Sequence, residues 1–568
     1  MKAATLLRRL QRLKTTYGAD AGARKLALLR GLDGGALARA GEVERLHESL
    51  CFLRAYPDDE DVLAQVEGML GRFDTRADLR RHRAALRDTG IAGTEVRFPF
   101  FLFTTEWLAR RWGDRMTVEW GGFGRKGGLE RLLPLFALYA ETPALDEYAL
   151  SVRAWVARMK APDETDAAFL IRRFRAAFPD PFAREAIFED LDIPIRLAPG
   201  PDTPSRTRAK HGVPRVAFQT GPLLRTRPAL ERELRRLPLA VRPVSSREAG
   251  RLIDLARAAM VTRSRDLDVF AHGDPRDVRL VDWGGGLRFA LIGAVPERRL
   301  LLEAVYGMLT LKNGVPVGYV LVSALYSSSE IAYNVFETFR GAEAAAIYGR
   351  VLATVRHLFG SGSFTIYPYQ LGHENAEALR SGAWWFYQKM GFRPRDPGTL
   401  RIMRRELARI KADPGHRSSI GTLKAVAQEN LFFGRGRPRA DVIGVLPLPN
   451  VGLRVMEYVA GRFGADREAA ARTCAREAAE RVGLRSLAEL TAGERLAWER
   501  WSPLVLVLPG LRRWSPGAKQ ALIRVVCAKG GRRESEYALL FDRHLPLRRA
   551  LKAVAESGDA AGPGRPLR

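Results

Sequence analysis

The chain has 568 residues, of which 46% are hydrophobic and 27% are charged, a composition that excludes an intrinsically disordered protein. At this length about two to four domains are expected. Lys and Arg outnumber Asp and Glu by 92 to 64, and the net charge of +28 favours polyanionic partners such as nucleic acid, an anionic membrane or the phosphates of an acyl-CoA.

Residues 1–195 are predicted to form a mainly helical domain. Apolar residues recur every three or four positions in segments such as 36–57 and 148–160, as in helices that bury one face. In residues 196–235, Pro, Gly, Ser, Thr and basic residues occur without this periodicity. That composition predicts a linker and extended segment between two domains.

Strand and helix patterns alternate from residue 236 to residue 397. Two β-rich runs in the segment 304–326 are joined by Asn313 and Gly314, which both tolerate the positive φ of a hairpin turn. A third β-rich run, 330–339, leads directly into a long helical pattern. The fold class expected here is α/β: a mixed, mostly antiparallel sheet with helices on both faces.

The remaining chain is predicted to be a mainly helical, basic region over residues 398–555, followed by a flexible tail at 556–568. The α/β domain is therefore flanked by mainly α-helical N- and C-terminal regions.

The junction between the third strand and its helix reads VFETFRGAEAA, residues 335–345. A helix N-terminus presents backbone N–H groups and partial positive charge, which together favour phosphate binding. A second motif follows in the last helical segment of the domain, formed by Asn375, Ala378, Tyr387, Lys389, Gly391 and Phe392. With these two motifs and this order of elements, residues 238–396 resemble the GNAT superfamily of N-acyltransferases.

The resemblance implies that the turn binds the diphosphate of acetyl-CoA or another acyl-CoA, and that Asn375 lies near the pantetheine arm. The residues that match this cofactor-binding role are Val335, Arg340, Gly341, Ala342, Glu343, Ala344, Ala345 and Asn375. Two positions depart from the family pattern, with Glu337 in place of Pro and Glu343 in place of the second Gly. A carboxylate at 343 would repel a diphosphate if it faced the ligand, or would stabilise the helix N-terminus if it faced away.

The resemblance also implies that Tyr387 protonates the leaving CoA thiolate. Acyl transfer needs a base for the incoming amine, and the candidates are Glu337 and Glu330, at the two ends of the third strand. Glu337 is preferred because it adjoins the phosphate turn. Plain structural roles remain open for all three residues, as a packed aromatic ring or solvated acids. Glu303, His373 and Glu374 are reserve candidates for the base.

Polar side chains gather after the next strand and could line an acceptor site or simply pack with their hydroxyls in solvent. They are Tyr367, Tyr369, Gln370, His373 and Asn375.

The leading hypothesis is an acyl-CoA-dependent N-acyltransferase that acts on an amine by direct attack on the thioester. A binding or scaffold protein on a degenerate GNAT fold is the first alternative. A basic nucleic-acid-associated protein is the second, with the segment FFGRGRPR at 432–439 as its first candidate contact.

Cys51, Cys474 and Cys527 are far apart, which suits a reducing compartment and offers no spacing for a zinc site. No stretch approaches the roughly 18–20 apolar residues of a membrane span. We therefore expect a cytoplasmic protein with no metal and no membrane span.

Overall fold

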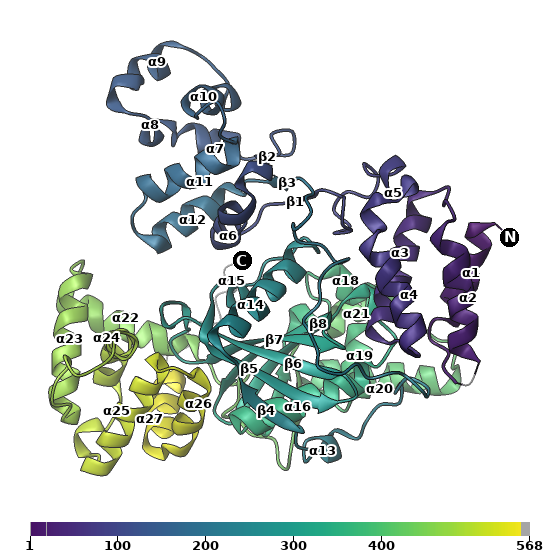
Figure 1. Cartoon of the computed structure of the whole chain (residues 1–568). Coiled ribbons are helices and arrows are strands. Elements are labelled where there is room, and N and C mark those ends of the chain that lie inside the picture. The colour runs from purple at the N-terminus through teal and green to yellow at the C-terminus, as the bar shows by residue number, and fades with distance from the viewer. Residues whose placement is uncertain (1, 19, 558–568) are drawn as a thin grey trace.

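The computed structural model describes residues 2–18 and 20–557 and is a mixed α/β structure (Figure 1). Its centre is a nine-stranded sheet with the order β11-β12-β10-β9-β8-β7-β6-β5-β4. All neighbouring strands in this sheet are antiparallel except β9 and β10, which run parallel. The expected mixed, mostly antiparallel sheet is thus present. Its strands are β4 Ala240–Pro243, β5 Gly273–Gly284, β6 Leu287–Ala294, β7 Ala304–Lys312, β8 Val315–Leu325, β9 Ser328–Val335, β10 Ser363–Ile366, β11 Arg393–Pro394 and β12 Leu431–Gly434.

The predicted hairpin at Asn313 and Gly314 is confirmed. The two residues join β7 to β8 with φ of 50° and 78°, values that a β-branched or bulky residue would adopt only under strain. The Asn313 side chain also holds neighbouring chain in place, because its Nδ2 donates to the carbonyls of Ala55 and Ala217, both at 2.9 Å.

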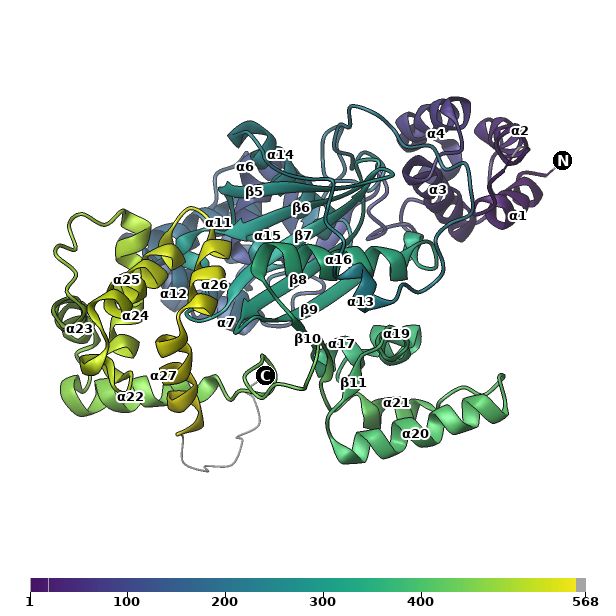
Figure 2. The ribbon, with the colours of Figure 1, turned by 90° about the horizontal axis from the view of Figure 1, so that it is seen from below.

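Helices cover both faces of the sheet, as expected (Figures 1 and 2). One face packs on α14 (Ser246–Val261), α15 (Asp268–Ala271) and the N-terminal helices. The other packs on α16 (Ala344–Phe359) and the C-terminal helices. Side chains alternate between the two faces along each strand, so Tyr319 on β8 belongs to the first core and its neighbour Val320 to the second.

The N-terminal region is mainly helical, but it consists of two parts. Residues up to about 91 share a core with the central sheet, whereas residues 96–197 form their own core around a small sheet of order β1-β3-β2. The elements are α1 Ala3–Leu13, α2 Ala21–Asp33, α3 Ala40–Ala55, α4 Glu60–Gly71, α5 Ala77–Arg81, β1 Val96–Phe98, α6 Leu102–Trp112, β2 Met116–Val118, α7 Lys126–Glu130, α8 Leu133–Phe136, α9 Thr142–Glu147, α10 Val152–Met159, α11 Asp166–Ala177, α12 Pro181–Leu191 and β3 Ile195–Leu197.

The predicted linker, residues 196–235, is largely irregular but lies against the protein. Thr207 is buried, where its hydroxyl bonds His47 and the amide of Ala92, each at 2.8 Å. Arg54 donates to the carbonyl of Thr207 at 2.6 Å. The segment is therefore held against the N-terminal helices and is not a free linker, because side chains from these helices satisfy its polar groups.

The C-terminal region is helical, as expected, yet the sheet extends past the predicted boundary at residue 397. Strand β12 follows two helices of that region and pairs with both β10 and β11. The remaining helices are α13 Leu230–Glu233, α17 Pro368–Leu371, α18 Ala376–Ser381, α19 Ala383–Lys389, α20 Pro397–Ala412, α21 Ile420–Val426, α22 Pro449–Phe463, α23 Arg467–Val482, α24 Ala492–Val507, α25 Pro516–Gly530, α26 Glu534–Arg543 and α27 Leu545–Glu556.

The predicted tail at 556–568 lies outside the described residues from 558 onward, and α27 continues to Glu556. None of the helices within residues 2–18 and 20–557 has the length and apolarity needed to span a bilayer.

Candidate functional site

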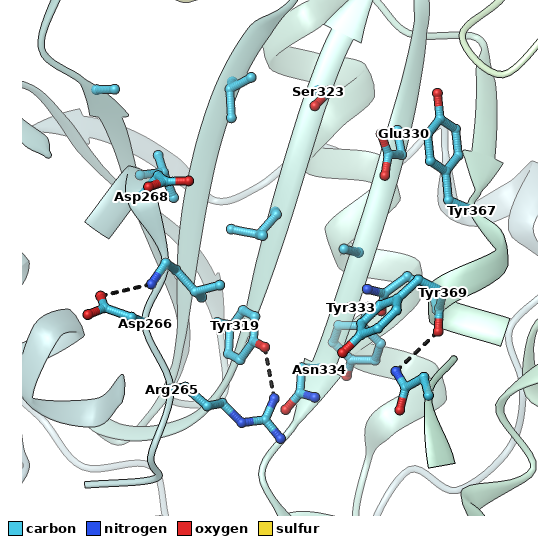
Figure 3. Close-up of a pocket in the computed structure, with 18 of the residues that line it drawn as sticks. Arg265, Asp266, Asp268, Tyr319, Ser323, Glu330, Tyr333, Asn334, Tyr367 and Tyr369 are labelled. Carbon is cyan, nitrogen blue, oxygen red and sulfur yellow. Dashed lines mark hydrogen bonds between the residues drawn. The ribbon is translucent and has the colours of Figure 1, made fainter. Parts of the chain in front are cut away.

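A cavity of about 1830 Å³ opens on the face of the sheet that carries α14 and α15. Its floor is formed by alternate side chains of β8 and β9, among them Tyr319, Ser323, Glu330 and Asn334 (Figure 3). The segment that joins α14 to α15 and helix α12 of the N-terminal region form its walls. The middle of the chain and its N-terminal flank therefore build this cavity together.

The parallel strands β9 and β10 separate inside this cavity. They are paired only from Ser328 to Glu330 on β9, opposite Ser363 to Thr365 on β10. Strand β9 then continues to Val335, whereas the chain after β10 turns into α17. Tyr333, Tyr367 and Tyr387 line the cavity where the strands diverge.

Glu330 lies at the point of divergence, between Ser323 of β8 and Thr365 of β10. Burial, and secondarily the nearby Glu303, raise the pKa of Glu330 to about 7. A carboxyl with this pKa is half ionised near neutral pH, which suits a general base. In Figure 3 its side chain lies next to Tyr367.

Glu337, the preferred base in the sequence analysis, does not line the cavity. Strand β9 ends at Val335, and Glu337 begins the short 3-10 helix η5 (Glu337–Phe339), where it is exposed to solvent. The reserve residues Glu303, His373 and Glu374 also lie outside the lining. Of the predicted bases, the structure places only Glu330 at the cavity.

The turn before α16 has a conformation that favours glycine at residue 341. Gly341 has φ of +80°, and a Cβ atom added there would meet open space. Among the described residues, the backbone N–H groups of Gly341, Ala344 and Ala345 donate no hydrogen bond. Gly341 and Ala344 line the cavity, so this end of it carries unpaired backbone donors at a helix N-terminus.

The predicted cofactor-binding residues separate into two groups. Val335, Arg340, Gly341, Ala344 and Asn375 line the cavity, whereas the side chains of the other three point into the protein. Those three are Ala342, in the core shared with the N-terminal helices, Ala345, in the core of the opposite face, and Glu343.

Glu343 turns away from the cavity and forms a nearly buried ion pair with Lys312 at the end of β7, at 3.1 Å. Its other oxygen accepts from the amide of Leu224 at 3.2 Å. The Lys312 ammonium also lies 4.8 Å from the centre of the Tyr56 ring. The Glu343 side chain therefore joins three parts of the chain and leaves the hollow beside Gly341 open.

We expect Glu343→Gln to lower the free energy of unfolding by about 2 kcal/mol, because Lys312 would keep its charge in a nearly buried site without a counterion. Urea unfolding followed by circular dichroism measures this. The double variant Lys312→Met with Glu343→Gln is the control, since it removes the unpaired charge and should be more stable than the single variant. Equal stability of the wild type and Glu343→Gln would show that the ion pair contributes nothing.

Side chains in and near the segment from Asn375 to Phe392 also meet at the cavity. The Asn375 side chain caps α18 by accepting from the amide of Ala378 at 3.0 Å, and its Nδ2 donates to the carbonyl of Tyr369 at 3.1 Å. Tyr367, Tyr369 and Gln370 line the cavity, whereas His373 does not. Burial raises the pKa of Tyr387 above its ordinary value, so its hydroxyl remains a proton donor.

Arg265 and Glu377 are among the cavity residues that the sequence analysis missed. Glu377 Oε2 accepts from Arg265 at 3.0 Å, and Glu377 Oε1 accepts from Arg340. With Arg263, three arginines line this end of the cavity beside the turn at Gly341. No local motif joins residues 265, 340 and 377, and only the tertiary fold brings them together.

Acidic side chains line the far end of the cavity, where α12 contributes Glu185 and Glu189. Burial first, and then neighbouring acids, raise the pKa of Glu189 to about 7. Ligand atoms of Glu185, Asp268 and His272 lie within 4.8 Å of one another. Glu185 already has two partners in the protein, His272 at 3.2 Å and the guanidinium group of Arg298.

No protein-family model, no curated protein and no solved structure matches this chain.

Proposed function

We propose that the protein is an acyl-CoA-dependent N-acyltransferase, with acetyl-CoA as the default donor and an amine as the acceptor. The observation that carries this proposal is the position of Glu330. A carboxyl with a pKa of about 7 lies where β9 and β10 diverge, in a cavity whose one end presents unpaired helix N-terminal amides and arginines.

The topology supports the proposal. Strands β7, β8 and β9, helix α16 after the turn at Arg340 and Gly341, and the parallel strand β10 that diverges from β9 follow one another in the order expected of a GNAT domain. The chain departs from that order in having two further antiparallel strands, β5 and β6, before β7. The orientation of Glu343 removes the main objection from sequence, because its carboxylate does not face the turn.

In the proposed reaction, the amides of Gly341 and Ala344, together with Arg340, hold the donor diphosphate. The pantetheine arm then extends past Asn375 into the space between the diverging strands. Glu330 takes one proton from the acceptor ammonium, so that the neutral amine can attack the thioester carbonyl. Tyr387 gives a proton to the sulfur as the C–S bond breaks, and the second proton lost by the nitrogen restores the Tyr387 hydroxyl, while the proton on Glu330 passes to solvent. The products are an amide and free CoA.

Equilibrium titration of the full chain with CoA tests the donor assignment, and acylation of a panel of primary amines by acetyl-CoA tests the reaction. Saturable CoA binding together with amide formation is the expected result. A chain that binds no CoA would instead be the scaffold described by the first alternative.

Tyr387→Phe is expected to reduce turnover about tenfold with little change in CoA affinity, because the donor would keep its phosphate contacts and lose the acid for its thiolate. Steady-state kinetics and CoA titration on the same preparation measure both quantities. Tyr348→Phe is the matched control, since Tyr348 is also buried but lies outside the cavity lining and its hydroxyl has no hydrogen-bond partner in the described structure. Unchanged turnover in Tyr387→Phe would remove this residue as the acid.

A further inference from the structure

The arginines at the phosphate end of the cavity are paired with a single carboxylate. Arg265 uses Nη2 to reach Glu377 at 3.0 Å, while its Nη1 donates to the hydroxyl of Tyr319 at 2.9 Å. Arg340 donates to the other oxygen of Glu377, and its Nε donates to the carbonyl of Val335 at 3.3 Å. Glu377 is thus the one ionised partner of both guanidinium groups in the described structure.

The three residues come from separate elements around the cavity. Arg340 precedes α16, Arg265 lies between α14 and α15, and Glu377 is in the first turn of α18, on the arm of the chain that follows β10. The Arg340–Glu377 pair therefore joins the segment after β9 to the segment after β10, and the Arg265–Glu377 pair joins the α14–α15 connection to that same segment. Figure 3 shows Arg265 extended toward Tyr319, below the region where the two strands separate.

Positive charge exceeds negative charge at the phosphate end of the cavity. Two guanidinium groups share one carboxylate, and the half-buried Arg263 lies close enough to Arg265 for the two charges to repel. Arg263 donates to the carbonyl of Ala259 and packs 3.6 Å from the centre of the Phe336 ring. The acid near it, Glu48, is already paired with Arg206, so two arginines share that carboxylate as well. A ligand with more than one negative charge would neutralise this end better than Glu377 does.

The pairs formed by Glu377 are also exposed enough to be displaced. Its side chain is 42% exposed and that of Arg340 is 38% exposed, and ion pairs in contact with solvent are weak because water and salt screen them. The unpaired amides of Gly341 and Ala344 lie at the same end of the cavity. An arriving diphosphate would gain these donors as well as the two arginines.

We propose that the carboxylate of Glu377 occupies the place of the donor's phosphates while no donor is bound. It pairs with Arg265 and Arg340 at the phosphate end of the cavity until a diphosphate displaces it. Arg265 is then a second phosphate-binding arginine, supplied from outside the strand-turn-helix motif. This inference rests on the proposed function for the identity of the ligand, and its chemistry is that of any diphosphate. The carboxylate of Glu377 competes with the ligand, so removing its charge increases affinity.

The test is equilibrium titration of the full chain, at low ionic strength, with inorganic pyrophosphate and separately with CoA. Glu377→Gln is expected to bind both about fivefold more tightly than the wild type, the gain that corresponds to losing one weak, solvent-exposed competing pair. Glu429→Gln removes the same charge from an exposed position outside the cavity, and this matched control is expected to bind both ligands as the wild type does. Adding Arg265→Gln to Glu377→Gln should reverse most of the gain.

Unchanged or weaker pyrophosphate binding by Glu377→Gln would overturn the role of Glu377, whatever CoA does. Undiminished binding by the double variant would overturn the role of Arg265. If pyrophosphate responds as expected while CoA binds to neither protein, the inference stands and the acyltransferase proposal fails. Thermal unfolding of each variant, with a midpoint close to that of the wild type, verifies that the arginines are compared in a folded chain.

Discussion

Glu330→Gln is expected to lower the turnover of acyl transfer on the order of 100- to 1000-fold, the range found when a positioned general base is lost. Glutamine has the same shape and cannot accept the proton from the ammonium. CoA affinity should change little, because Glu330 lies at the divergence of β9 and β10 and not at the turn that holds phosphate. Steady-state kinetics with saturating acetyl-CoA measures the loss.

The pH profile gives a second readout. Since Glu330 works as the ionised form, the wild-type rate should rise with pH through about 7, where its pKa lies. The variant should lose that rise. Glu337→Gln is the informative comparison, because Glu337 is exposed and outside the cavity, and its profile should match that of the wild type. If Glu337→Gln loses the rise and Glu330→Gln keeps it, the base has been assigned to the wrong carboxyl.

The Glu330→Gln variant should be less active than the wild type but more stable at alkaline pH. The pKa of Glu330 is raised from 4.5 to about 7 on folding, mainly by burial, so the folded chain binds this proton more tightly than the unfolded chain. The stabilisation that the protonated Glu330 side chain gives the folded chain is complete below pH 4.5 and is lost as the pH rises through 7. Glu330→Gln should therefore be more stable than the wild type at pH 8, by up to about 3 kcal/mol, with no such gain at pH 4. A variant that is both inactive and less stable at pH 8 would indicate a structural role.

Several features could be predicted because their cause is local. Asn313 and Gly314 specify a tight hairpin through their tolerance of positive φ, and Gly341 specifies the turn before α16 for the same reason. The alternation of strand and helix patterns predicted the mixed sheet. In each case, the residues that determine the structure are adjacent in sequence, so the structure can be predicted from them without knowledge of the fold.

The remaining site residues depend on contacts between distant segments. Glu343 could have faced either way, and its direction was decided by Lys312, 31 positions earlier, and by the amide of Leu224. The choice between Glu330 and Glu337 depended on where β9 separates from β10 and ends. The pairing of Glu377 with Arg265 spans 112 positions. The position of β12 at the sheet edge was missed because a four-residue strand between helices has too little pattern to be distinguished from a loop.

A negative charge introduced at residue 341 tests most directly whether the turn before α16 binds phosphate. Gly341→Asp is expected to weaken CoA binding on the order of 100-fold relative to Gly341→Asn, because a carboxylate there would lie beside the donor's diphosphate and the unpaired amides of α16. Asparagine is the matched control. It has the same shape as aspartate, both residues tolerate the φ of +80° at this position, and the Cβ of either would extend into open space. The two variants thus share any backbone strain and differ in one charge.

The salt dependence of this difference identifies its origin. If the aspartate acts through repulsion of the diphosphate, raising the ionic strength should narrow the gap between the two variants, because salt screens interactions between partly exposed charges. Pantetheine, which lacks the phosphates, should bind both variants equally. Equal CoA affinities for Gly341→Asp and Gly341→Asn would mean that no phosphate approaches the N-terminus of α16. In that case Arg340 and the free amides beside it would have no phosphate to bind, and Glu330 would lie in a cavity that holds no thioester for a deprotonated amine to attack.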